Sequence, residues 1–328
     1  MNKKITIQPK LKLSDLFIRI SDGEYKFSDY IFKSGRYSLF CILKTILRSK
    51  NIKKIYVPNF ICDEVIQGIG SFNLEIIYYD IREDFSLDTI SLKKTLCSKS
   101  LLVVVNYFGI RSNWEEINEM KNELDITVIE DNCHSLTNYK NYKLGINGDL
   151  SFNSIRKIIP VLSGSELLVM NKKYLVDYTY QKRLPTLNET IYYFRRYLYF
   201  LNAFKNNIRV ENKYHKINKI SHADILSYRA IKMNKYPMRH IQQRRLANFR
   251  FWHSYLSDKK LSFFEFNEKV QDEFLPYAFP CYANNRDTAN KWIKWGSQNN
   301  ISIIKWPKFP SGINQKTMKS CFKNVLLF

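Results

Sequence analysis

Short apolar runs alternate with amphipathic segments through the first half of the chain. Residues 101–105 are continuously apolar, which is typical of a parallel strand buried on both faces. Elsewhere apolar residues recur three and four positions apart, as at 39, 42, 43, 46 and 47, which indicates a helix with one buried face. We predict strands at 54–60, 74–80, 101–105, 126–129 and 167–170, and helices at 39–47, 61–69, 87–96 and 114–124.

This alternation of strands and helices predicts an α/β fold with a mainly parallel sheet. Beyond residue 170 the pattern changes to helices at 242–256 and 286–299 and strands at 275–282 and 301–306, which indicates a smaller α+β domain. We therefore divide the chain into an N-terminal arm (1–29), a large α/β domain (30–190), and connecting helices with a small C-terminal domain (191–328). The aromatic and basic segment 192–201 is interpreted as a core or interface helix, with a membrane-surface helix as the alternative.

Charge narrows the possible partners only slightly. The net charge is +22, from 52 Lys and Arg against 30 Asp and Glu, which would attract nucleic acid, a membrane surface or small anions. Because the lysines are spread along the whole chain, we expect no nucleic-acid partner. No apolar run approaches the ~20 residues that span a bilayer, and the N-terminus lacks an apolar signal core. We expect no integral membrane segment and a cytoplasmic protein.

The cysteines give no sign of a metal site. The six cysteines are scattered, and no two form a Cys-x-x-Cys pair. In a chain of 328 residues they are interpreted as reduced, mostly buried thiols, and we expect no structural zinc.

Chemistry-bearing residues gather after the predicted strand 126–129. The strand leads into Glu130, Asp131 and His134, and a serine-rich turn some twenty residues later leads to Lys157. Ligands of open α/β sheets bind beyond the carboxyl ends of the strands, where Asp131 is expected to lie. Asp131 and Lys157 are therefore candidates for the two ends of one cofactor site, and an ordinary strand end with a surface lysine is the alternative.

A second candidate lies at the start of the predicted helix 39–47. Ser34 and Gly35 precede its apolar face, so free backbone N–H groups and the helix dipole would attract an anion there. A plain helix cap remains the alternative.

Taken together, these motifs resemble those of the DegT/StrS-type sugar aminotransferases, a family of fold-type-I enzymes that use pyridoxal 5′-phosphate (PLP). Residues 34–39 (Ser-Gly-Arg-Tyr-Ser-Leu) resemble the Ser-Gly-Thr-x-Ala-Leu phosphate turn of the family. Residues 57–60 (Val-Pro-Asn-Phe) are similar to Val-Pro-Ser-Phe/Tyr, and 106–109 (Asn-Tyr-Phe-Gly) to His-x-Tyr-Gly. Residues 128–134 (Val-Ile-Glu-Asp-Asn-Cys-His) resemble Val-Ile-Glu-Asp-x-Ala-Gln/His, and 148–157 the Gly-Asp…Ser-Phe…Lys segment.

The resemblance implies an aspartate aminotransferase-like large domain and a PLP cofactor. It implies that Lys157 is the Schiff-base lysine, that Asp131 pairs with the pyridine nitrogen and that His134 lies near the phenolic oxygen. It further implies phosphate binding by the turn Ser34, Gly35 and Arg36 and by Ser154, with Phe60 or a neighbour packed near the ring. These roles suit the residue types, because a PLP enzyme needs an amine, a carboxylate at the ring nitrogen and an anion cradle.

The sequence departs from the family pattern around the lysine. The family spacing Ser-Phe-x-x-x-Lys, counted from Ser151, places Arg156 at the key position, but arginine stays protonated and cannot form the Schiff base. We therefore assign Lys157. The usual Gly-Glu-Gly-Gly is replaced by Ser-Gly-Ser-Glu at 163–166, and a further C-terminal helix is expected where the chain ends at Phe328.

The resemblance implies an aminotransferase that moves an amino group from an amino acid, glutamate above all, to a keto sugar nucleotide. Surface-polysaccharide or secondary-metabolite biosynthesis is the implied pathway, and a homodimer the implied assembly. A non-catalytic or regulatory protein on the same fold is one alternative. A PLP-dependent sugar dehydratase is another, although a histidine commonly replaces the lysine in those enzymes.

Overall fold

The structure is a computed structural model of the chain. It describes residues 9, 25–136, 144–174, 176–191, 194, 217–233, 236–257, 259, 262–263, 275–306, 309–310, 312–313 and 320–328. The predicted N-terminal arm and the aromatic segment 192–201 lie largely outside these residues, so both interpretations stay predictions.

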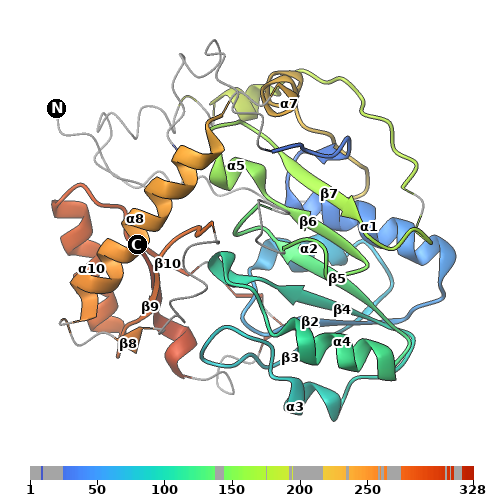
Figure 1. Cartoon of the computed structure of the whole chain (residues 1–328), viewed down its shortest axis with the longest axis horizontal. Helices are drawn as coiled ribbons and strands as arrows, with labels where there is room; N and C mark the ends of the chain where they lie inside the picture. Colours follow the sequence, from blue (N-terminus) through green and yellow to red (C-terminus); the bar gives the residue numbers. More distant parts are fainter. Residues whose placement is uncertain are drawn as a thin grey trace.

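A seven-stranded sheet organises the first half of the chain, with strand order β1-β7-β6-β5-β4-β2-β3 (Figure 1). Strands β2 to β6 run parallel to one another, whereas β7 is antiparallel to both β6 and β1. Every residue of β4 and β5 is buried, as their apolar runs predict. The strands are β1 (Ile31–Phe32), β2 (Lys54–Pro58), β3 (Glu75–Tyr79), β4 (Ser100–Val105), β5 (Ile126–Asn132), β6 (Leu150–Asn153) and β7 (Ser165–Val169).

Helices follow the strands in the predicted alternation. Helix α1 packs against β6, β7 and α2, because Leu39, Ile42, Leu43 and Ile46 form its buried face. The helices of this half are α1 (Gly35–Ser49), α2 (Asp63–Ile69), α3 (Thr89–Lys93), α4 (Trp114–Glu123) and α5 (Ile155–Ile158). The α/β fold with a mainly parallel sheet is confirmed.

The C-terminal unit comprises two long helices and an antiparallel sheet of order β10-β11-β9-β8, beside the large sheet in Figure 1. Helix α7 precedes the unit and lies near the β7 edge of the large sheet (Figure 1). The elements are α7 (Ile225–Lys232), α8 (Met238–Ser257), β8 (Ser262–Phe263), β9 (Pro280–Tyr282), α10 (Arg286–Gln298), β10 (Ile304–Lys305) and β11 (Val325–Leu327). The predicted division at residues 30 and 190 stays a prediction.

Two predicted strands of the C-terminal unit are too long. Of the predicted strand 275–282, only 280–282 form strand β9, and at the start of the predicted range the Tyr277 N–H donates instead to the Phe108 carbonyl, 2.9 Å away. Of the predicted strand 301–306, only 304–305 form strand β10, and the Ile301 N–H donates to the Gly296 carbonyl.

An aromatic cluster joins the large sheet to the C-terminal unit. Phe60, which follows β2, is fully buried and stacks on Trp306, with ring centroids 4.2 Å apart. The Phe322 ring also packs against the Phe60 ring, with centroids 4.9 Å apart. The main hydrophobic core therefore continues from the large sheet into the C-terminal unit and fixes the two against each other.

In the part of the chain that the structure describes, no helix combines the length and apolarity that crossing a bilayer requires. The same residues contain no cluster of His, Cys, Asp and Glu suited to a metal ion.

Candidate active site

Asp131 lies at the carboxyl end of β5, in the middle of the parallel sheet. Its neighbours in register are Val105 on β4 and Phe152 on β6. The side chain is only 3% exposed, and Oδ1 accepts the Cys133 N–H at 2.8 Å. Burial raises the pKa of Asp131 above its ordinary value, although Cys133 and Lys157 oppose that shift. No cation lies within 4 Å of this carboxylate among the described residues, so it is suited to a cationic ligand group.

Lys157 follows β6, the strand next to the one that carries Asp131. Strand β6 runs parallel to β5 and leads through Ser154 into the one-turn helix α5, which carries the lysine. Lys157 is half-buried, and its Nζ lies 5.4 Å from the centre of the Tyr277 ring. Burial acts to lower the pKa of Lys157, and negative charge on Cys133, Tyr277 or Cys62 would act to raise it. Asp131 and Lys157 therefore lie close enough for their charges to interact.

His134 forms the middle layer of an aromatic stack. Its ring lies nearly parallel to Phe108, with centroids 5.3 Å apart, and to Tyr277, with centroids 5.0 Å apart. The Phe108 N–H donates to His134 Nδ1 at 3.3 Å, which assigns the ring proton to Nε2. Burial, reinforced by the charge of Lys157, holds the pKa of His134 well below its ordinary value. The imidazole is thus a neutral hydrogen-bond donor beside the lysine.

Helix α1 begins against the same edge of the sheet. A Cβ atom on Gly35 would lie 2.5 Å from Cys133 Sγ and 3.4 Å from Phe152, so glycine permits this close approach. Ser34 is the N-cap residue, yet its buried Oγ has no hydrogen-bond partner and does not cap the helix. A buried hydroxyl at a helix N-terminus is suited to an anionic ligand group.

Of the other predicted site residues, Ser154 and Arg36 lie near this edge and Phe60 lies deeper. Ser154 is the N-cap residue of α5, 2% exposed, and its carbonyl accepts the Lys157 N–H. Arg36 follows Gly35 in α1, and its guanidinium lies 5.8 Å from the centre of the Tyr37 ring. Phe60 has no exposed surface and belongs to the aromatic cluster, so its packing near a cofactor ring stays a prediction.

Two thiols that the sequence analysis did not single out lie close to Asp131 and Lys157. Burial raises the pKa of Cys62 to about 12, while the charge of Lys157 opposes the shift. Burial also raises the pKa of Cys133 well above its ordinary value, and Asp131 adds to the effect. Both thiols are therefore neutral at physiological pH and line the site rather than act as nucleophiles.

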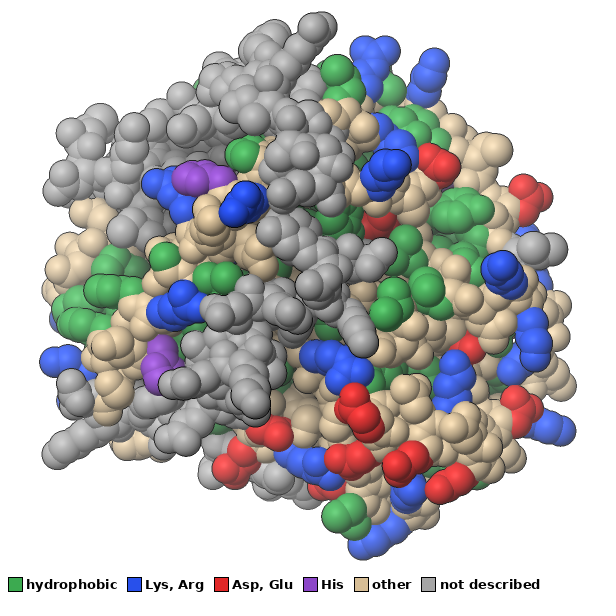
Figure 2. Space-filling model, viewed as in Figure 1, with side chains coloured by type: hydrophobic (Ala, Val, Ile, Leu, Met, Phe, Trp, Pro, Cys, Tyr) green, Lys and Arg blue, Asp and Glu red, His purple; other side chains and the backbone are tan. Residues whose placement is uncertain are grey.

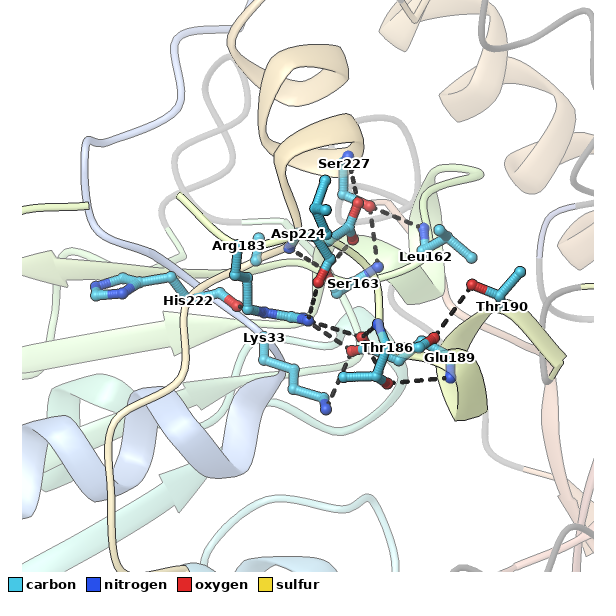
Figure 3. A network of polar contacts seen from close by, with 12 residues as sticks. Lys33, Leu162, Ser163, Arg183, Thr186, Glu189, Thr190, His222, Asp224 and Ser227 are labelled. Atoms are coloured by element: carbon cyan, nitrogen blue, oxygen red, sulfur yellow. Dashed lines mark hydrogen bonds and ion pairs between the residues drawn. The ribbon is translucent and has the colours of Figure 1, made fainter. Parts of the chain in front are cut away.

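The turns that carry Ser34 and Lys157 are anchored by neighbouring polar networks (Figure 3). Lys33 immediately precedes Ser34 in sequence, and its ammonium lies 3.0 Å from the Glu189 carboxylate. After Lys157, the Ser163 hydroxyl donates to the Asp224 carboxylate, and the Ser227 hydroxyl accepts the Ser163 N–H at 3.1 Å. The first turn is thereby tied to the segment that carries Glu189, and the second to the start of α7.

The residues that replace the family's Gly-Glu-Gly-Gly take part in hydrogen bonds that glycine could not form. The Ser165 hydroxyl donates to the Asn153 carbonyl and lies 2.7 Å from the Ser38 hydroxyl. The buried Glu166 carboxylate accepts from Tyr25 and Asn153. These side chains link β7 to α1 and β6, so the altered turn is a well-bonded structure.

The site therefore offers a buried carboxylate for a cation, an amine, and a helix N-terminus with an unpaired hydroxyl for an anion. The chain is similar to known proteins in sequence and in fold. Residues 43–184 match the sequence model of the DegT/DnrJ/EryC1/StrS aminotransferase family. The resemblance to the DegT/StrS family is confirmed. The match contains Asp131, His134, Ser154 and Lys157, and it excludes Ser34.

Solved structures of sugar aminotransferases share the fold of this chain. PseC from Helicobacter pylori, an aminotransferase of pseudoaminic acid biosynthesis, is 11% identical, with a TM-score of 0.65, over 99% of this chain and 93% of PseC. The candidate sugar aminotransferase Spr1654 from Streptococcus pneumoniae, in its PMP form, is 12% identical, with a TM-score of 0.66, over 100% and 92%. NtdA from Bacillus subtilis, with bound PMP, is 16% identical, with a TM-score of 0.61, over 95% and 69%. No curated protein matches this chain in sequence.

Proposed function

We propose that this chain is a PLP-dependent aminotransferase that moves an amino group from an amino acid to the keto group of a nucleotide-linked sugar. The observation that carries the proposal is that Asp131 and Lys157 lie near each other at the carboxyl edge of the sheet without forming an ion pair. The carboxylate is buried without a cation, and the lysine has no carboxylate within 4 Å among the described residues. Such an arrangement is costly unless a ligand completes it.

PLP has the groups that the site lacks. Its pyridine nitrogen suits the Asp131 carboxylate, its aldehyde suits the Lys157 amine, and its phosphate suits the start of α1. The buried Ser34 hydroxyl without a partner is the most specific sign of the last of these. Bound PLP would supply an electron sink for negative charge that develops on the substrate carbon.

The chain's own residues divide the remaining work. Asp131 would hold a proton on the pyridine nitrogen, because a buried carboxylate favours a cation beside it. Lys157 would bond to the cofactor aldehyde through Nζ and, when released, would carry the proton removed from the donor's α-carbon. His134 would donate its Nε2–H to the phenolic oxygen, since Nδ1 already accepts the Phe108 N–H. The aromatic stack around His134 would keep water out.

Three further residues complete the proposed cofactor site. Gly35 would keep the start of α1 close to the sheet edge at which the phosphate would bind, because a Cβ there would meet Cys133. Arg36 and Ser154 would add a charge and a hydroxyl from the two turns. Phe60 would support the site by packing in the aromatic cluster.

The proposed substrates are glutamate as amino donor and a keto sugar nucleotide as acceptor, in polysaccharide or secondary-metabolite biosynthesis in the cytoplasm. Three observations support them: the family match, the role of PseC in pseudoaminic acid biosynthesis, and the net charge of +22, which favours anionic substrates. Figure 2 shows Lys and Arg scattered over one face, with Asp and Glu gathered near α3. Among the described residues of this face, Lys and Arg form no continuous basic stripe of the kind that nucleic acid would favour.

We also propose a homodimer. Leu184 and Leu187 are 78% and 75% exposed, and Leu226 is 46% exposed. The first and the last lie near each other, because the Ile225 N–H donates to the Arg183 carbonyl at 2.9 Å. Exposed apolar side chains that gather in this way favour a protein partner. Sedimentation velocity should give twice the chain mass, and Leu184→Asp should shift the protein toward the monomer.

The test of the proposed function is amino transfer itself. Purified protein loaded with PLP is incubated with glutamate and a panel of nucleotide-linked keto sugars, and the formation of 2-oxoglutarate and amino sugar is followed by mass spectrometry. We expect both products with at least one sugar, none with Lys157→Ala, and unchanged turnover with Lys172→Ala, since Lys172 is exposed. Loss of a sugar hydroxyl without 2-oxoglutarate would identify a dehydratase instead. Absence of PLP binding would favour the non-catalytic alternative.

A further inference from the structure

The turn that carries Lys157 receives a hydrogen bond from the C-terminal unit. Helix α5 has only four residues, so its last carbonyl groups lack partners within the helix. The Lys157 carbonyl instead accepts from Nη2 of Arg245, 3.2 Å away, and Arg245 lies in helix α8 of the C-terminal unit. The backbone position of the lysine therefore depends on a side chain outside the segment that matches the family.

The same guanidinium also holds the segment that faces the lysine. Nη1 of Arg245 donates to the carbonyls of Pro276, at 3.2 Å, and Tyr277, at 2.9 Å. Burial lowers the pKa of Arg245 to about 10, so the side chain is still charged at neutral pH. One cation thus ties together carbonyl groups of two segments that are more than a hundred residues apart in sequence, and the fixed fork of a guanidinium is suited to that task.

Tyr277 is held on both sides of its peptide. Its carbonyl accepts from Arg245, and its N–H donates to the Phe108 carbonyl at 2.9 Å. The tyrosine ring then lies 5.0 Å from the His134 ring and 5.4 Å from Lys157 Nζ. The distance to Nζ is within the range in which an ammonium is attracted to an aromatic face.

We propose that Arg245 and Tyr277 are positioning residues for Lys157. Arg245 holds the lysine's carbonyl, and the face of the Tyr277 ring holds its ammonium. The proposal rests on the proposed function in one respect: the purpose of the positioning is to keep the lysine ready for PLP. The arrangement itself is a property of the cofactor-free chain and can be measured there.

The first experiment measures the reactivity of Lys157 in the cofactor-free, full-length chain. Trace acetylation with acetic anhydride at a series of pH values, read by peptide mass spectrometry, gives the midpoint at which the amine becomes reactive. An aromatic face stabilises the ammonium, so Tyr277→Leu should lower this midpoint by about 0.5 to 1.5 pH units. Tyr277→Phe keeps the ring and should restore more than half of the shift. Equal midpoints in all three proteins would overturn the role of Tyr277.

The second experiment tests Arg245 by amide hydrogen exchange. In Arg245→Gln, which cannot reach all the carbonyls, peptides covering 155–159 and 275–279 should exchange about 10-fold faster or more. Arg245→Lys keeps the charge but lacks the fork, and it should lie between Arg245→Gln and the parent chain. Arg244→Gln is the matched control, because Arg244 is the exposed neighbour in α8 and should leave both peptides unchanged. Unchanged exchange in Arg245→Gln, or acceleration spread evenly over the chain, would overturn the role of Arg245.

These outcomes are separable from those of the proposed function. If the chain transferred no amino group, the acetylation and exchange results would still show whether Arg245 and Tyr277 position the lysine. If transfer occurred but the Tyr277 and Arg245 variants behaved as the parent chain in both measurements, only the positioning role would fail.

Discussion

Glu130 is a buried carboxylate that holds the loop leading to the lysine strand. It is fully buried next to Asp131 in β5. Oε1 accepts from Asn106 Nδ2 at 2.9 Å and from the Gly145 N–H at 2.6 Å. Oε2 accepts the N–H groups of Asn147, at 3.0 Å, and Gly148, at 3.2 Å. Since β6 begins at Leu150, these bonds fix the entry into the strand that carries the site.

Glu130→Gln keeps the shape and replaces one of these oxygens by an NH₂ group. Two of the four donors then face another donor, whichever way the amide is turned. Asn106 cannot turn to help, because its Oδ1 already accepts the Ser112 N–H at 2.8 Å. Each hydrogen bond to a charged group contributes about 1.5 to 3 kcal/mol, so the loss should be about 3 to 6 kcal/mol of unfolding free energy. Total stabilities are typically about 5 to 15 kcal/mol, so the effect should be large.

Urea unfolding followed by circular dichroism measures this loss. We expect a lower midpoint with an unchanged slope, and the control Glu119→Gln, an exposed position on α4, should stay within about 0.5 kcal/mol of the parent. A loss below about 1 kcal/mol for Glu130→Gln would refute the reasoning, because unpaired buried donors cost more than that.

The remaining predictions concern the two ends of the site and its support. Ser34→Ala should weaken PLP binding about 10-fold in an absorbance titration without lowering cofactor-free stability, because its buried hydroxyl has no partner in the chain. His134 stays neutral when folded but takes up a proton near pH 6.5 when unfolded, so unfolding free energy should fall by up to about 1.4 kcal/mol per pH unit below pH ~6.5. In urea titrations between pH 5 and 8, His134→Gln should remove this slope and His240→Gln, at an exposed position, should not. Asp224→Ala should cost about 2 to 5 kcal/mol in thermal unfolding, because it removes a helix cap and the acceptor of the buried Ser163 hydroxyl proton (Figure 3). Asn285→Ala, which removes only an exposed cap, should cost about 1 kcal/mol.

Hydrophobic periodicity was sufficient to place one half of the site. The run at 126–129 is a buried central strand, and its polar continuation carries Asp131 to the edge where ligands bind. Strand β6 escaped prediction because half of its four residues are polar. Ser151 and Asn153 are buried only because they find partners in Gly145 and Glu166, which no hydropathy pattern reveals.

The contacts around the lysine were beyond a reading of local patterns for a different reason. Arg245 and Tyr277 reach Lys157 from positions 88 and 120 residues further along the chain. Their role depends on how the C-terminal unit packs against the large sheet, and that packing is set by the aromatic cluster around Trp306. Cys62 is near the lysine because α2 starts beside the sheet edge.

The most direct test of the central claim asks which residue bonds to PLP. The visible absorption spectrum of the purified chain is recorded with added PLP, before and after borohydride reduction, and the reduced protein is mapped by peptide mass spectrometry. The account predicts a visible band that borohydride abolishes and a pyridoxyl group on Lys157, with Asp131→Asn weakening the band. A pyridoxyl group on another lysine, or no modified peptide at all, would contradict it.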